Sequence, residues 1–286
     1  MQSSISNLNL KPDTYYYLSP YGLGDTMMIC GFLDAIKQKN QSENIHFFIK
    51  PNHEIIMKMY GIKDYTVFSF DFFDNREYLK ELSERNPYPK PGEVFIAHPK
   101  FGPFENLLKE FNEFKMDFRH LYINFFGLDE SVDFKHPIWY PSISDEVQQK
   151  LSELAPLEKI ILVAPEARSC GKLIANYWNK IVQNQHKKGF VCIENAIGTP
   201  STNAPHFELS LSDCIAIAIN CAGVYSLRSG LCDLISCIGD KLTVIYPDKK
   251  TYLLYSLNKN FNTETIQEKI IDRKKLRWNF ILRIFY

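Results

Sequence analysis

Residues 14–39 read TYYYLSPYGLGDTMMICGFLDAIKQK. Aromatic, β-branched and aliphatic side chains fill the first five positions, which predicts a strand over Thr14–Leu18. A polar, glycine-bearing turn follows at Ser19–Asp25. Apolar residues then recur at helical spacing, which predicts a helix from about Thr26 to Lys39. A strand, a turn and a helix in this order form the repeating unit of a parallel α/β sheet.

This rhythm continues along the chain and restarts once. Further strands are predicted at Ile45–Ile49, Tyr65–Phe70, Val94–Ala97, Lys159–Ala164, Phe190–Glu194, Val224–Leu227 and Leu242–Tyr246. Helices are predicted at His53–Tyr60, Ser144–Leu154, Ala175–Lys188, Ser212–Cys221 (capped by Ser212) and Leu231–Ile238, and one or two helices at Glu105–Phe126. The stretch Asp129–Ser144 holds two prolines and no sustained period, so it is predicted to be a linker. We therefore expect an α/β protein with two Rossmann-like domains of parallel sheet facing a cleft, residues 1–138 and 139–286.

Composition excludes several classes of function. The 286 residues include 33 basic and 33 acidic side chains, so the formal charge is zero and a general affinity for nucleic acid is not expected. No uncharged apolar run approaches ~18 residues, and the first residues lack the pattern of a secretory signal. The seven cysteines include no CxxC pair, and Cys30, Cys192, Cys214 and Cys237 lie in apolar runs where burial is expected. These features predict a cytoplasmic protein.

Ligands of parallel α/β sheets bind at the carboxyl ends of the strands, so the loops after strands are the first places to look for a site. The loop Tyr21–Asp25 has glycines at positions 22 and 24, which allow a ligand to approach the backbone, and Asp25 at the start of a helix. Asp25 is either a helix cap or a functional carboxylate. A dinucleotide-binding motif would need a third glycine where Met27 stands, so NAD binding is disfavoured.

Two later loops are basic and suit a phosphate group. Arg168 and Lys172 follow the apolar strand Lys159–Ala164, and they can hold a diphosphate, Arg through a bidentate fork and Lys as a point charge. Ser229 and Gly230 open the helix predicted after Val224–Leu227, where backbone N–H groups favour an anion. The plainer interpretation of both loops is solvated surface charge and turn residues.

Taken together, these motifs resemble a known family. The motifs are GLGD at 22–25, Pro165 with its basic loop and Trp178, LSLSD at 209–213, Ser229-Gly230, and LTVIYP at 242–247. They resemble the bacterial lipopolysaccharide heptosyltransferases of glycosyltransferase family 9 and related two-domain (GT-B) glycosyltransferases. The family typically has Asp and His where this chain has Arg228 and Asp233. The Ser-Gly pair also resembles the corresponding turn of bacterial α-1,6-fucosyltransferase relatives.

The resemblance implies a glycosyltransferase that moves a sugar from a nucleotide-activated donor to a bacterial surface polysaccharide, such as lipopolysaccharide or capsule, or to a lipid-linked acceptor. Whether the sugar is a hexose, heptose or fucose stays open. Asp25 matches the family's acid–base residue. The implied donor-binding residues are Gly24, Arg168, Ser169, Lys172, Glu194, Arg228, Ser229 and Gly230. The expected acceptor-binding residues, which follow strands of the first domain, are Lys50, His98 and Lys100.

No metal and no cofactor are expected for this transfer. The acidic segment Asp71-Phe72-Phe73-Asp74 has the wrong spacing for a DxD motif, and basic side chains are expected to stabilise the leaving diphosphate instead. Two other functions stay open. A non-catalytic nucleotide-sugar-binding protein of the same fold is the first. An NAD-dependent epimerase is the second, and the missing third glycine and the lack of a suitable Tyr-x-x-x-Lys pair argue against it.

The end of the chain is basic and amphipathic. Residues 269–286 contain six basic residues and one acidic residue, and apolar residues recur there at helical spacing. This pattern predicts a C-terminal helix that either closes the second domain or makes a peripheral contact with the inner face of an anionic membrane.

Overall fold

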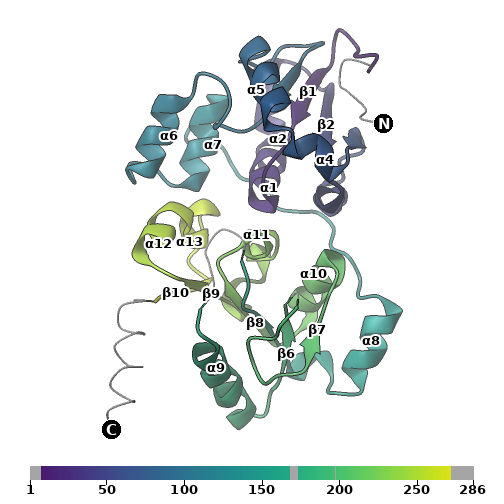
Figure 1. The fold of residues 1–286 in the computed structure, drawn as a ribbon, viewed down its shortest axis with the longest axis vertical. Coiled ribbons are helices and arrows are strands. Elements are labelled where there is room, and N and C mark those ends of the chain that lie inside the picture. Colours follow the sequence, from purple (N-terminus) through teal and green to yellow (C-terminus); the bar gives the residue numbers. More distant parts are fainter. Residues whose placement is uncertain (1–7, 168–172, 197, 272–286) are drawn as a thin grey trace. The chain divides into compact units, whose positions relative to one another are not determined.

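The chain divides into two compact units, residues 1–139 and 140–286 (Figure 1). The computed structural model describes residues 8–167, 173–196 and 198–271. Each unit contains its own sheet, and every pairing between the named strands is parallel. The division falls one residue after the predicted boundary, inside the predicted linker Asp129–Ser144.

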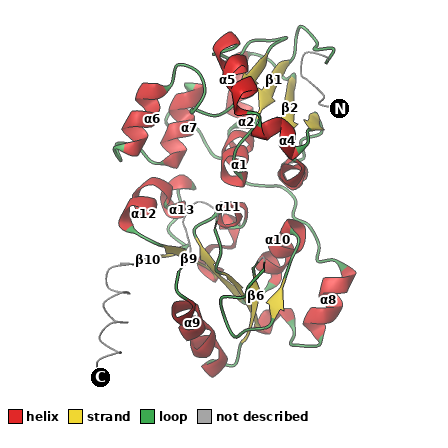
Figure 2. Ribbon diagram, in the orientation of Figure 1, coloured by secondary structure: helices red, strands yellow, loops and turns green. Residues whose placement is uncertain are grey.

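The first unit is built on a four-stranded sheet (Figure 2). Its strands are β1 (Tyr15–Leu18), β2 (Ile45–Ile49), β3 (Tyr65–Val67) and β4 (Val94–Ile96), and their order is β3-β2-β1-β4. Because β1 pairs with both β2 and β4, the loops that follow these three strands emerge at neighbouring positions along one edge of the sheet.

The first unit holds seven α-helices in its described part. They are α1 (Leu23–Gly31), α2 (Leu33–Asn40), α3 (Glu54–Met59), α4 (Phe70–Asp74), α5 (Arg76–Arg85), α6 (Glu105–Asn112) and α7 (Phe118–Phe126). A 3₁₀ turn at Pro51–His53 precedes α3. The strand predicted over Tyr65–Phe70 ends at Val67, and Phe70 instead begins α4.

The single helix predicted over residues 26–39 needs two corrections, because the helix begins at Leu23 and the structure contains two helices that meet at Phe32. The carbonyl of Gly31 accepts a hydrogen bond from the Lys135 N–H at 2.9 Å. A Cβ atom on Gly31 would lie 2.1 Å from the ring of Phe134, so only glycine lets this segment pack so closely.

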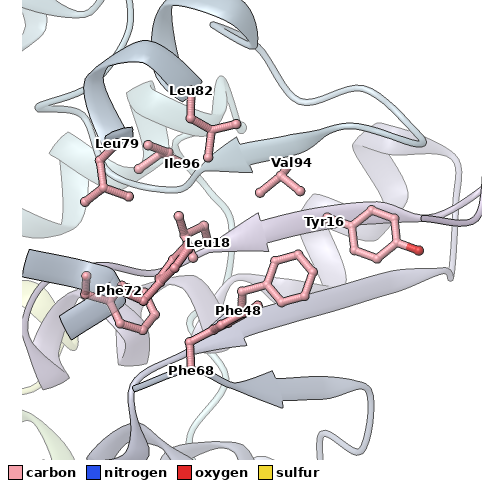
Figure 3. Packing of buried hydrophobic residues seen from close by; sticks show 10 residues of the cluster. Tyr16, Leu18, Phe48, Phe68, Phe72, Leu79, Leu82, Val94 and Ile96 are labelled. Carbon is pink, nitrogen blue, oxygen red and sulfur yellow. The ribbon is translucent and has the colours of Figure 1, made fainter. Parts of the chain in front are cut away.

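Side chains cover the first sheet on both faces. Figure 3 shows one face, where Tyr16, Leu18, Phe48, Val94 and Ile96 pack with residues of α4 and α5. Alternate residues of the strands point to the opposite face. There, the ring of Tyr17 packs edge-to-face with Phe95 of β4 and with Phe126 of α7. Burial on both faces explains why β1, β2 and β4 read as nearly continuous apolar runs, whereas the edge strand β3 is partly exposed.

The second unit is built on a six-stranded sheet in the order β10-β9-β8-β5-β6-β7. Its strands are β5 (Ile160–Ala164), β6 (Val191–Asn195), β7 (His206–Phe207), β8 (Gly223–Leu227), β9 (Leu242–Tyr246) and β10 (Gln267–Ile270). The strands β5 and β8 are paired, so the two basic segments follow neighbouring strands. The sequence pattern missed β7 and β10.

The described part of the second unit contains six α-helices. The α-helices are α8 (Asp145–Ser152), α9 (Ala175–Lys187), α10 (Leu211–Asn220), α11 (Gly230–Leu234), α12 (Lys249–Tyr255) and α13 (Leu257–Asn260). Two 3₁₀ segments lie at Leu157–Lys159 and Ser236–Lys241. The predicted cap of α10 is corrected, because Ser210 and not Ser212 accepts the N–H of Asp213 at the helix start. Trp178 and Val182 of α9 pack against Ile161 and Val163 of β5.

Two further predictions for the second unit need correction. Lys269 and Ile270 belong to β10, so the predicted helix over residues 269–286 does not begin at Lys269, and its remainder from residue 272 lies outside the described residues. Cys237 is exposed, whereas Cys30, Cys192 and Cys214 are buried as predicted. Among the described residues, no helix is long and apolar enough to cross a membrane.

Candidate functional site

The loop after β1 places Asp25 in the first turn of α1. Asp25 is the third residue of α1, and Gly22, which directly precedes the helix, is its N-cap. The Gly22 N–H donates to Oδ2 of Asp25 at 2.8 Å, so the carboxylate folds back over the helix start. A Cβ atom on Gly22 would lie 3.1 Å from this oxygen, closer than an ordinary contact, so a larger residue here would press on the carboxylate. Asp25 therefore does serve as a cap, and its other contacts show whether it does more.

A buried chain of hydroxyl and imidazole groups fixes the turn that carries Asp25. The hydroxyl of Thr26 lies 2.7 Å from the Ser19 hydroxyl and 2.7 Å from Nδ1 of His53. All three side chains are buried. Burial, together with the charge of Lys50, lowers the pKa of His53 to about 3, so this imidazole is neutral at physiological pH. These hydrogen bonds thereby connect α1 to the end of β1 and to the 3₁₀ turn after β2.

Two side chains from distant parts of the sequence approach the other oxygen of Asp25. The Tyr122 hydroxyl, in α7, donates to Oδ1 at 2.8 Å. Nε2 of His98, in the loop after β4, lies 3.6 Å from the same oxygen. The side chains of Asp25 and His98 are 17% and 16% exposed, so a ligand can still reach them. Burial lowers the pKa of His98, the Asp25 carboxylate partly offsets this, and Lys100 lowers it further.

The structure brings the three predicted acceptor-binding residues to the same loop cluster. The rings of His98 and Tyr21 have centroids 4.1 Å apart, and the Lys100 ammonium lies 5.5 Å from the Tyr21 ring centroid. The Lys50 ammonium lies 3.5 Å from the Tyr21 carbonyl oxygen and 5.5 Å from the ring centroid of Phe73. This cluster combines two cations, an aromatic ring and a carboxylate in the first unit. Such a set can bind a hydroxylated, negatively charged molecule and accept a proton from it.

In the second unit, the structure places Arg228 in a buried ion pair. Its guanidinium donates to both carboxylate oxygens of Asp233, at 2.9 and 2.7 Å, and to the carbonyl of Tyr255 at 2.9 Å. The side chains are 6% and 3% exposed. Burial works against the charge of Arg228, but Asp233 outweighs it and the pKa of Arg228 is raised. These contacts engage the guanidinium within the protein, and the predicted contact of Arg228 with a donor stays a prediction.

Glu194 is also engaged within the protein. It is fully buried at the end of β6, and its carboxylate accepts hydrogen bonds from the N–H groups of Ser201 and Thr202 and from the Thr202 hydroxyl, at 2.6 to 2.8 Å. Glu194 therefore holds the loop that precedes β7. Its predicted contact with the ribose or base of a donor stays a prediction.

The other predicted donor-binding residues lie in three different parts of the chain. Ser229 and Gly230 lie where β8 ends and α11 begins, as predicted. Gly24 is buried in the first turn of α1, in the first unit. Arg168, Ser169 and Lys172 lie outside the described residues, and Pro165 and Glu166 lead into that segment after β5.

Sequence reasoning missed two members of the cluster around Asp25. Tyr21 stands inside the quoted loop, and its position beside Gly22 could have drawn attention to it. Tyr122 gives no local signal, because it appears only as one apolar-face residue of a predicted helix. Its role depends on the packing of α7 against α1, which sequence spacing does not reveal.

Two further features of the described residues lie apart from this cluster. No group of three or more His, Cys, Asp or Glu side chains in the described part of the chain is arranged to hold a metal ion. A shallow hollow of about 500 Å³ is lined by Lys58, Lys63, Tyr65 and Trp139 together with Gly61 and Ile62. None of these residues belongs to the predicted site.

Comparison with solved structures gives the fold a name. A glycosyl transferase of family 9 from Veillonella parvula is 13% identical, and the match covers 96% of this chain and 91% of that one with a TM-score of 0.57. The fold is that of the family 9 glycosyltransferases. This result confirms the predicted α/β class with two parallel sheets of the GT-B type, and the resemblance noted in the sequence.

Two other glycosyltransferases share this family 9 fold. The E. coli heptosyltransferase WaaC, solved with ADP, is 10% identical over 94% of this chain and 99% of its own, with a TM-score of 0.52. TibC from enterotoxigenic E. coli, an iron-containing dodecameric glycosyltransferase, is 13% identical over 83% of this chain with a TM-score of 0.54. The match spans 59% of the TibC chain. No protein-family model matches this sequence, and no curated protein matches it significantly.

Proposed function

We propose that this protein is a glycosyltransferase, which moves a sugar from a nucleotide-activated donor to a hydroxyl group of a saccharide acceptor. The observation that carries the proposal is the carboxylate of Asp25, held by Gly22 and Tyr122 at the carboxyl end of β1. The shared fold with heptosyltransferases supports it. The three predicted acceptor-binding residues gather around the same carboxylate, which a plain helix cap would not require.

The proposed reaction is a displacement at the anomeric carbon of the donor sugar. The acceptor oxygen forms a bond to this carbon, and the bond between the carbon and the diphosphate oxygen breaks. The electron pair of the broken bond leaves with the nucleoside diphosphate, and the proton of the acceptor hydroxyl moves to the carboxylate of Asp25. General-base assistance of this kind contributes ~10²–10⁴-fold to a rate.

The donor is proposed to bind the second unit. Arg168 and Lys172, which follow β5 in the sequence, are proposed to stabilise the charge of the diphosphate together with Ser229 and Gly230 after the neighbouring strand β8. We propose that no metal ion and no cofactor take part in this stabilisation. ADP-linked sugars are the first donors to test, because WaaC was solved with ADP and TibC with ADP-D-β-D-heptose.

The acceptor is proposed to be a bacterial surface saccharide or a lipid-linked saccharide that binds the first unit. Lys50, Lys100 and His98 surround Tyr21 beside Asp25, so the acceptor would carry a phosphate or carboxylate near the reacting hydroxyl. A lipid-linked acceptor would also suit the basic segment of residues 269–286, for which we propose a peripheral contact with an anionic membrane. Sedimentation with phosphatidylglycerol vesicles, compared with a chain ending at residue 271, tests that contact.

A non-catalytic nucleotide-sugar-binding protein is the second candidate function. The observation in its favour is the ion pair Arg228–Asp233, which replaces the pair typical of the family at the donor turn. A thermal-shift screen with ADP, GDP, UDP and CDP detects binding under both functions. A ligand at a hundredfold excess over its dissociation constant stabilises the folded state by about 2.7 kcal/mol. Release of the nucleoside diphosphate from the matching nucleotide sugar occurs only if the protein is a transferase.

A further inference from the structure

A histidine beside an aspartate in a candidate site has two opposite roles. In one, the aspartate orients the histidine, and the histidine takes the proton from the substrate. In the other, the histidine donates to the aspartate, and the aspartate takes the proton. The positions of the two ring nitrogens decide between these roles, because a nitrogen that already accepts a hydrogen bond cannot also serve as the base.

The backbone of Lys100 fixes which ring nitrogen of His98 carries the proton. The Lys100 N–H lies 3.0 Å from Nδ1 of His98, and a backbone N–H can only donate. Nδ1 is therefore the unprotonated, accepting nitrogen, and in the neutral ring the hydrogen sits on Nε2. Nε2 is the atom that faces Oδ1 of Asp25 at 3.6 Å. Nδ1 of His98 thus accepts a hydrogen bond from the Lys100 N–H, and the protonated Nε2 faces Asp25.

We propose that His98 is a positioning residue for Asp25, and that Oδ2 of Asp25 is the oxygen that takes the acceptor proton. This inference rests on the proposed glycosyl transfer. It removes His98 from consideration as the base and gives the two carboxylate oxygens different tasks. Nε2 at 3.6 Å is too far for a full hydrogen bond, so its effect on Oδ1 in the ligand-free protein is electrostatic.

The contacts of Asp25 support this division of tasks. A carboxylate oxygen can accept two hydrogen bonds. Oδ1 already accepts from the Tyr122 hydroxyl at 2.8 Å and faces Nε2 of His98. Oδ2 accepts from the Gly22 N–H at 2.8 Å, which is its one hydrogen bond among the described residues. Oδ2 therefore retains a lone pair for an acceptor hydroxyl, while the Tyr122 hydroxyl holds the carboxylate against rotation and Nε2 of His98 attracts Oδ1 electrostatically.

A first experiment needs no substrate. Long-range ¹H–¹⁵N correlation spectra of the full chain, with the His98 signals assigned by loss in His98→Gln, report which ring nitrogen is protonated. We expect Nδ1 of His98 to resonate as unprotonated and Nε2 as protonated at pH 7.5. The reverse pattern, or a doubly protonated ring at that pH, would overturn the inference whatever the protein catalyses.

A second experiment compares two replacements of His98 in steady-state sugar transfer, with ADP-D-β-D-heptose as the first donor. The amide of Gln can reach the position of Nε2, whereas the amide of Asn reaches only the position of Nδ1. We expect His98→Gln to keep kcat within about threefold, and His98→Asn and Tyr122→Phe to lower it roughly tenfold or more, in Tyr122→Phe with KM little changed.

The outcomes separate the inference from the proposed function. If His98 is the base, Gln and Asn both lower kcat by ~10²–10⁴-fold, as Asp25→Asn does, and the inference is wrong. If the wild-type protein transfers no sugar from any nucleotide sugar that binds it, the proposed function fails and the role assigned to Oδ2 fails with it. The spectroscopic result then still decides which ring nitrogen of His98 carries the proton.

Discussion

Tyr122 donates its hydroxyl to Oδ1 of Asp25 at 2.8 Å, although 97 positions separate the two residues in the chain. The bond joins α7 to the first turn of α1. Asp25 therefore has one contact typical of a capping box, to the Gly22 N–H, and a second that capping does not need. This second contact, with His98 beside it, distinguishes a positioned carboxylate from a plain cap.

Replacing Gly22 by alanine should disturb the carboxylate without disturbing the fold. The backbone of Gly22 has a φ of −84°, which any residue can adopt, but the added Cβ would lie 3.1 Å from Oδ2 of Asp25. We expect sugar transfer to fall roughly tenfold, with the free energy of unfolding changed by no more than about 0.5 kcal/mol. The control is Asp25→Asn alone, and the double variant should be no slower than that control. Unchanged turnover in Gly22→Ala would show that the position of Oδ2 is unimportant.

Removing the charge of Asp25 and removing the charge of Lys100 should shift the pKa of His98 in opposite directions. Burial holds this pKa below the ordinary value of 6.5, the Asp25 carboxylate raises it, and Lys100 lowers it. Asp25→Asn should therefore lower the pKa further, and Lys100→Met should raise it. NMR titration of the imidazole signals measures both shifts. A pKa that rises in Asp25→Asn would contradict the described arrangement.

His53 should make the protein less stable in acid. Its pKa falls from 6.5 in the unfolded chain to about 3 in the folded protein, so between these values the unfolded chain binds a proton that the folded protein does not. Stability from this group is complete above pH 6.5 and is lost as the pH falls, by at most about 1.4 kcal/mol per pH unit.

The matched variant for this test is His53→Asn, whose amide can still reach Thr26 but does not titrate. Urea unfolding at pH 7, 6 and 5 should give a shallower loss of stability in this variant than in the wild type. The other histidines contribute equally to both proteins. Equal slopes would mean that His53 does not stay neutral in the folded state.

Breaking the ion pair Arg228–Asp233 from one side should be costly. Arg228→Met leaves a buried carboxylate without its main partner, which destabilises a protein by about 3–5 kcal/mol. The double variant Arg228→Met/Asp233→Leu removes both charges, and we expect it to be more stable than Arg228→Met alone. Chemical denaturation measures both. If Arg228→Met unfolds like the wild type yet loses nucleotide affinity, Arg228 contacts the donor directly instead.

The sequence pattern predicted the sheets well because both are buried on two faces. Strands such as Ile160–Ala164 and Leu242–Tyr246 read as continuous apolar runs, and their bounds differ from the predicted ones by at most one residue. Short or polar elements escaped detection. The strand Gln267–Ile270 carries three polar residues in four positions, and only its pairing with β9 makes it a strand.

The candidate site was predictable only where it depends on strand order. Asp25, Lys50 and His98 each follow a strand, and parallel topology brings the ends of neighbouring strands together. The partners of these residues were not predictable. Glu194 and Arg228 look like ligand-binding side chains in the sequence, but the structure shows their polar atoms engaged by Thr202 and Asp233. Charge at a strand end indicates a candidate, and only the packed structure shows what that charge contacts.

The most direct test of the account is the rate at which Asp25→Asn releases nucleoside diphosphate and forms glycosylated product, relative to the wild-type protein. Asn keeps the shape of the side chain but removes the base, so we expect turnover to fall by ~10²–10⁴-fold. The donor's dissociation constant should stay within about twofold, because the proposed donor-binding residues after β5 and β8 belong to the second unit and Asp25 belongs to the first. The loss of one hydrogen bond to a charged group would change that constant far more. Near-normal turnover in Asp25→Asn would contradict the account and leave Asp25 as a helix cap.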